Sequence, residues 1–116
     1  MVSTPASRRE AIVEAIVEAR RTDGRVVFEA DGTGPVTYED RTLDLRVEGT
    51  QRDRLEALLD SYHVFKRQQP ATRKAPDGAV VLSAVTDPKH AADFVESLFR
   101  EVYDAPTGYV LTVEPR

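Results

Sequence analysis

Residues 79–114 read AVVLSAVTDPKHAADFVESLFREVYDAPTGYVLTVE and are predicted to form a strand, a helix and a strand. The unbroken apolar run 79–85 is typical of a strand that is covered on both faces. Asp87 and Pro88 then supply a helix cap and a first helical residue. Apolar side chains recur at helical spacing after them, and 109–114 is predicted to be a strand. We therefore expect a right-handed β-α-β crossover with the strand 79–85 near the centre of a sheet.

Upstream of this unit, glycine and proline residues divide the chain into further short elements. The sequence predicts a helix at 5–22, an antiparallel meander of strands at 25–30, 35–39 and 42–47, and a helix from 51 to about 68. The element order is then α-β-β-β-α-β-α-β. We expect one α+β domain over residues 1–116, with a mixed five-stranded sheet and the helices packed on it.

The composition excludes several classes of protein. The chain has 116 residues with no Cys and two His, so disulfide frameworks, thiolate nucleophiles, zinc ribbons and iron–sulfur clusters are ruled out. No apolar run is long enough to span a membrane, and the polar start does not resemble a signal peptide, so a cytoplasmic protein is expected. Acidic side chains outnumber basic ones by 20 to 16, and most of the basic ones are arginine. Adaptation to a hypersaline cytoplasm and a codon bias both account for this balance.

Motifs that would indicate catalysis are missing. The sequence contains no nucleophile elbow, phosphate-binding loop, dinucleotide-binding glycine pattern or zinc-protease helix. His90 has Asp87 and Asp93 three residues to either side, a spacing that could serve acid–base chemistry or a metal. Asp87 is nevertheless expected to cap the helix, which leaves His90 as a solvated residue of the first turn. We therefore predict no catalytic residue, no metal and no cofactor.

A ligand pocket is one alternative interpretation of the C-terminal unit. Ser83, Thr86 and His90 lie at the predicted end of the strand 79–85, and open α/β sheets collect ligands at the carboxyl ends of their strands. The start of the next helix would add free backbone N–H groups for an anion. The carboxylate of Asp87 would oppose an anion there. A small-molecule binder or an enzyme at this position is thus the second alternative.

The most localised charge feature is the stretch 63–74, which reads HVFKRQQPATRK and has no acidic residue. Its cations are Lys66, Arg67, Arg73 and Lys74. Such a segment could contact a phosphate backbone, dock on an acidic patch of a protein partner, or complement the end of the preceding helix as a solvated loop.

Self-association is a further hypothesis. The first helix carries apolar side chains on more than one narrow stripe, at Ile12, Val13, Ile16 and Val17. Part of that surface could form a symmetric homodimer interface, and an unpaired edge strand could pair across a two-fold axis. Complete burial against the domain's own sheet is the competing explanation.

These observations favour a small non-catalytic protein-interaction or regulatory domain with an unknown protein partner. A nucleic-acid-binding accessory protein that uses the basic segment from Lys66 to Lys74 is the first alternative. No membrane association is expected.

Overall fold

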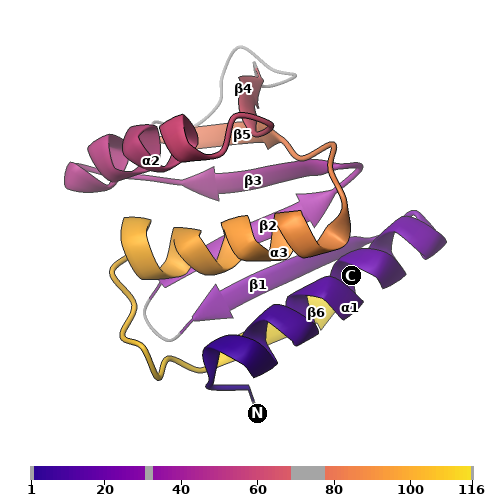
Figure 1. The fold of residues 1–116 in the computed structure, drawn as a ribbon. Coiled ribbons are helices and arrows are strands. Elements are labelled where there is room, and N and C mark those ends of the chain that lie inside the picture. The colour runs from indigo at the N-terminus through magenta and orange to yellow at the C-terminus, as the bar shows by residue number, and fades with distance from the viewer. Residues whose placement is uncertain (1, 31–32, 69–77, 116) are drawn as a thin grey trace.

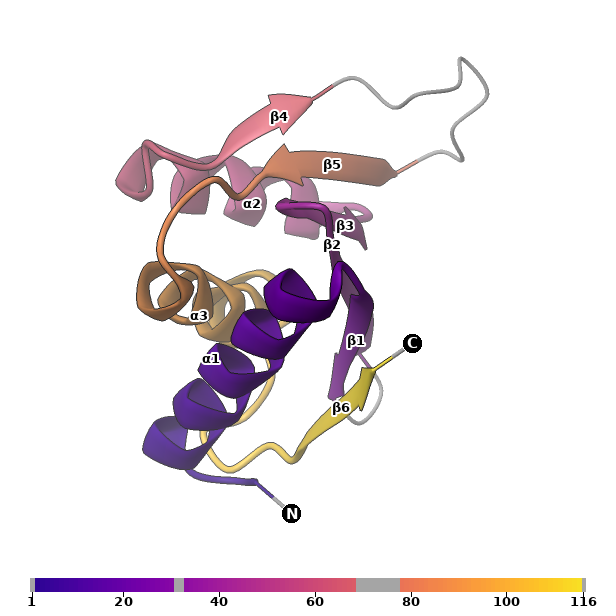
Figure 2. The same cartoon turned by 90° about the vertical axis from the view of Figure 1, so that its right-hand side faces the viewer.

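The computed structural model describes residues 2–30, 33–68 and 78–115, and they form an α+β sandwich of one sheet and one layer of helices (Figure 1). The elements in chain order are α1 (Pro5–Thr22), β1 (Arg25–Ala30), β2 (Thr33–Glu39), β3 (Thr42–Arg46), α2 (Thr50–Ser61), β4 (Lys66–Gln68), β5 (Ala79–Ser83), α3 (Pro88–Ser97), the π-helical turn η1 (Leu98–Val102) and β6 (Leu111–Pro115). Figure 2 shows the three helices on the same side of the sheet. None of the described helices is long and apolar enough to cross a membrane.

The predicted fold class, element order and meander are confirmed, but the sheet differs from the prediction in three ways. It has six strands in the order β4-β5-β3-β2-β1-β6, and every neighbouring pair is antiparallel, so the expected mixed five-stranded sheet is wrong. β5 lies second from an edge rather than near the centre. The reason is that the whole meander separates β5 from β6, so α3 connects two strands that are not neighbours.

The additional strand β4 arises because the second helix is shorter than predicted. α2 ends at Ser61, and the chain turns so that Phe65 stacks on Phe94 of α3 with ring centroids 4.0 Å apart. Phe65 is buried in the core at 2% exposure. Lys66 follows in an extended conformation and pairs with Ser83 of β5. Burial of the aromatic ring against α3 therefore replaces the last predicted helical turns.

The two faces of the sheet have different side chains, as strand alternation requires. On the helix side the strands bury apolar residues, among them Phe28, Leu43 and Leu82, all at 0% exposure. On the other face, which no described helix covers, the cross-strand register places polar side chains side by side. One such row runs Arg25, Glu39, Thr42, Ser83, Lys66.

Candidate functional site

The structure does not bring together the three residues of the predicted ligand pocket. Ser83 alternates with the buried Leu82, so its side chain lies on the uncovered face of the sheet. Thr86 lies in the connection to α3, where its backbone carbonyl accepts a hydrogen bond from the Arg20 guanidinium of α1. This contact is on the helix side. The Ser83 side chain and the Thr86 carbonyl therefore do not line one common pocket.

His90 has a packing role in the first turn of α3. Its backbone N–H donates to Asp87 Oδ1 at 2.9 Å, which confirms Asp87 as the helix cap and holds the pKa of that carboxyl below its usual value. Its ring stacks on Phe65 with centroids 5.6 Å apart. The described residues include no group of three or more His, Cys, Asp or Glu side chains that could hold a metal. The imidazole thus packs against an aromatic ring on the helix side of the sheet, whereas the Ser83 side chain lies on the uncovered face.

Strand alternation separates Lys66 and Arg67, the two cations of the basic segment that lie within the described residues. Lys66 points to the uncovered face of the sheet, whereas Arg67 pairs with Leu82 and faces the helices. There its guanidinium forms an ion pair with Glu56 of α2. Arg73 and Lys74 lie outside the described residues. Lys66 and Arg67 are therefore adjacent in sequence without belonging to one surface patch.

The apolar residues of α1 have different environments. Ile12 and Ile16 are fully buried in the domain's own core, so self-burial accounts for both. Val13 is partly buried against that core. Val17 is 46% exposed and is the member of the set that remains on the surface. The helix therefore offers less apolar surface for a symmetric interface than the sequence pattern indicates.

A buried polar cluster that the sequence interpretation missed connects α1, α3 and the chain before β6. Arg8 is fully buried and donates to Glu96 through Nε at 2.9 Å and through a terminal nitrogen at 2.7 Å. Its other terminal nitrogen donates to the backbone carbonyls of Ser3 and Tyr109. The hydroxyl of Tyr109 donates to Glu96 Oε1 at 2.7 Å, and Arg8 also lies over its ring.

This cluster shifts the titration of its members in directions that follow from burial and pairing. Burial alone would raise the pKa of Glu96, but the hydrogen bonds from Arg8 and Tyr109 and the charge of Arg8 hold it below its usual value. Burial and the bond to Glu96 raise the pKa of Tyr109. No described buried side-chain nitrogen or oxygen lacks a hydrogen-bond partner. The polar side chains of the cluster therefore have partners within the domain, and these contacts join α1, α3 and the chain before β6.

A polar cavity of about 160 Å³ lies between the end of α1 and the turn that joins β2 to β3. It contains Arg20 and Arg41 together with Asp23 and Asp40, so charges of both signs line it. The Nε of Arg20 donates to the hydroxyl of Tyr38 at 2.7 Å. This hydrogen bond connects the Arg20 guanidinium of α1 to β2 of the sheet.

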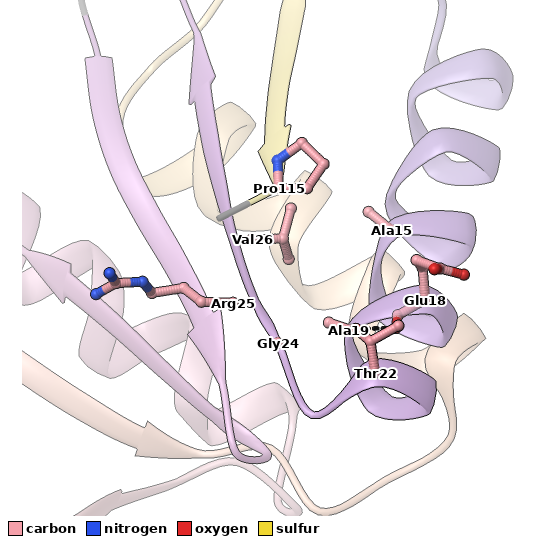
Figure 3. Close-up of a pocket in the computed structure, with 8 residues that line it drawn as sticks. All are labelled: Ala15, Glu18, Ala19, Thr22, Gly24, Arg25, Val26 and Pro115. Atoms are coloured by element: carbon pink, nitrogen blue, oxygen red, sulfur yellow. Dashed lines mark hydrogen bonds between the residues drawn. The ribbon is translucent and has the colours of Figure 1, made fainter.

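An apolar groove of about 310 Å³ separates the second half of α1 from the strands β1 and β6 (Figure 3). Ala15 and Ala19 form its helical wall, and Val26 and Pro115 form the opposite wall. It exists because two methyl groups on α1 face the sheet where larger side chains would close the space. Arg25 points away from the groove in Figure 3, toward the uncovered face.

The rim of the groove is polar, and its side chains are paired. Glu18 lines it and forms an ion pair with Arg21 at 2.6 Å, one turn along the helix. The hydroxyl of Thr22, also at the rim, donates to the backbone carbonyl of Glu18 at 2.9 Å. The groove therefore combines an apolar floor with a polar rim, an arrangement that is common at protein–protein interfaces. The helical spacing of Ala15 and Ala19 was visible in the sequence, but their separation from β6 depends on the tertiary fold.

Comparison with known proteins places the whole described chain in one family. A family model described as a family of unknown function (DUF7975) matches residues 2–115. No curated protein and no solved structure matches the chain.

Proposed function

The chain belongs to the DUF7975 family of unknown function, and we propose that it is a non-catalytic protein-interaction domain that binds its partner through the groove between α1, β1 and β6. The groove itself is the observation that carries this proposal. Its walls are Ala15 and Ala19 of α1 on one side and Val26 and Pro115 on the other, of which Ala19 and Val26 are buried at 7% and 2% exposure. Apolar side chains of a partner would lose contact with water there, which is the main source of binding free energy at such surfaces.

The other polar groups of the interior support a non-catalytic role. Arg8, Glu96 and Tyr109 satisfy one another, and Arg20 is held by Tyr38 and the carbonyl of Thr86. A group whose hydrogen bonds are already made to structural partners is poorly placed to exchange protons with a substrate. Binding without turnover is therefore the function that this set of contacts favours.

The proposal is tested by selecting peptides from a random displayed library on the immobilised domain and measuring their binding to two variants. Ala15→Phe fills the groove, because Ala15 forms its helical wall. Val17→Phe is the matched control, since Val17 lies on the same helix, is 46% exposed and does not line the groove. Circular dichroism and thermal unfolding first establish that both variants fold.

We expect the selected peptides to bind the wild-type domain and Val17→Phe alike and to lose at least about tenfold in affinity for Ala15→Phe, a difference of about 1.4 kcal/mol. Peptides that bind all three proteins equally would place the contact surface elsewhere and refute the proposal. A selection that enriches no peptide would refute it as well.

A further inference from the structure

We infer that the groove receives an amphipathic α-helix with a basic outer face, supplied by a partner protein. This inference rests on the proposed function and adds the kind of segment that binds. Three observations carry it: the blocked edge of β6, the small residues of the helical wall, and an acidic row along α1.

An extended partner segment finds little to pair with at the edge of β6. Leu111 donates its N–H outward to the carbonyl of Val2 at 2.9 Å, so this position is already occupied. Every second residue of an edge strand directs its backbone N–H and C=O groups away from the sheet, so the next two such residues are Val113 and Pro115. Pro115 has no N–H to donate. Val113 is thus the single residue of β6 with an outward N–H group that is not already bonded to Val2. One such donor is too few for a partner strand to pair with β6.

A helix fits the groove because it would continue the existing layer of helices. α1 lies over β1 and β6 on the helix side of the sheet (Figures 1 and 2), and the groove opens along its flank. Ala15, Ala19 and Thr22 follow one another at spacings of four and three residues, so they form a line of small side chains along α1. Small side chains let a second helix approach closely, at the short end of the usual interaxial distances. Apolar residues of that helix would then contact the exposed Pro115 and cover the buried Val26 at the bottom of the groove.

Charge determines which helix is favoured. Glu10, Glu14 and Glu18 recur every four residues and form one exposed row on α1, of which Glu18 lines the groove. Glu18 is paired with Arg21, whereas Glu10 and Glu14 form no ion pair with any residue in the described ranges. Like charges at this spacing oppose helix formation. Lysine or arginine residues on the outer face of a bound helix would relieve that repulsion.

The same acidic row argues against a second copy of this chain as the occupant. A symmetric dimer through this flank of α1 would bring two rows of glutamates together. Such a contact places like charges opposite each other, which is the arrangement that suppresses wrong partners at interfaces. A different, basic protein is therefore the expected partner.

The inference is tested by calorimetry with three synthetic peptides of about 18 residues, a length that can hold a helix. The first has leucine on one helical face and lysine on the other. The second replaces each lysine with glutamate. The third has the composition of the first, rearranged so that leucine and lysine alternate and favour an extended chain. We expect only the first to bind, with an affinity that falls at least about tenfold for Ala15→Phe and that weakens with added salt.

A charge variant separates electrostatics from folding. Glu14→Lys converts the acidic row into alternating charges, so the helix should be as stable as before or more stable. We nevertheless expect the basic helical peptide to bind this variant about three- to tenfold more weakly. Asp60→Lys, an exposed acidic position on α2 away from the groove, is the control and should bind as the wild-type domain does.

The possible outcomes distinguish the two claims. If the acidic or the alternating peptide binds better than the basic helix, and Ala15→Phe abolishes that binding, the groove is an interaction site but the inferred helix is wrong. If no peptide binds in a manner sensitive to Ala15→Phe, both claims fail. If the wild-type domain is a dimer in solution and Ala15→Phe is a monomer, the groove is occupied by a second copy and the inference is wrong.

Discussion

Replacing Glu96 by glutamine tests whether the buried cluster holds α1 and α3 together. Glu96 accepts three hydrogen bonds, two from Arg8 and one from the hydroxyl of Tyr109. A glutamine keeps the shape but presents one NH₂ group where a carboxylate oxygen stood. Either orientation of the amide places this NH₂ group against an N–H or O–H donor of Arg8 or Tyr109, so at least one hydrogen bond is lost. The charge of the buried Arg8 also loses its carboxylate partner.

The expected cost in the free energy of unfolding is about 3–5 kcal/mol, which is typical for removing one partner of a buried ion pair. The matched control is Asp93→Asn. Arg9 and Asp93 also join α1 to α3, at 2.9 Å, but their side chains are 53% and 47% exposed. Solvent screens this pair, so its loss should cost at most about 1 kcal/mol and should matter less in high salt.

Urea unfolding followed by circular dichroism at pH 7 measures both variants, at low and high salt. Equal destabilisation by Glu96→Gln and Asp93→Asn, or a cost below about 1 kcal/mol for Glu96→Gln, would show that the buried cluster does not hold α1 and α3 together. If Glu96→Gln does not fold, Tyr109→Phe removes a single bond to the carboxylate and should cost about 1.5–3 kcal/mol. Because the pKa of Glu96 is lowered in the folded state from the ordinary value of 4.5, the stabilisation by its carboxylate is present above pH 4.5 and is lost as the pH falls further.

Three further predictions concern the backbone and one tyrosine. Gly78→Ala should destabilise the domain clearly more than Gly49→Ala in urea unfolding. Both glycines have a positive φ, but only at Gly78 would an added Cβ lie 2.6 Å from the carbonyl oxygen of Val47. Equal costs would contradict this. Asp87→Ala should cost about 1 kcal/mol by the same assay through loss of the α3 cap, whereas Asp87→Asn should be nearly neutral. Burial raises the pKa of Tyr103 from 10.0 to about 12, so its stabilisation is complete below pH 10 and is lost by about pH 12. Unfolding of Tyr103→Phe across that range should depend less on pH, and an unchanged dependence would contradict the assignment.

Local signals in the sequence predicted most of the fold. Asp87 and Pro88 mark the start of α3, and the alternation of Leu43 and Leu45 marks β3, because caps and burial on one face depend on few residues. β4 was missed because Tyr62 and Phe65 are three residues apart, which suits a helical stripe as well as a turn that folds back on Phe94. The strand order depends on contacts between segments that are distant in sequence, so no local sequence pattern predicts it.

The site was harder to predict because its features depend on which face each residue occupies. Lys66 and Arg67 form a basic run in sequence, but a strand directs them to opposite faces of the sheet. Arg8 had a recognisable signal, since it lies at helical spacing from Ile12 and Ile16 and therefore on the buried stripe. The groove required the distance between α1 and Pro115, which only the packed structure provides.

Binding of a basic helix in the groove between α1, β1 and β6 can be observed residue by residue in a methyl NMR titration. The leucine–lysine helical peptide is added to the labelled domain while the ¹H–¹³C signals of alanine and valine are followed. We expect the signals of Ala15, Ala19 and Val26 to shift and those of Val17 and Val85 to stay unchanged. Shifts confined to residues outside the groove, or no shifts at all, would contradict it.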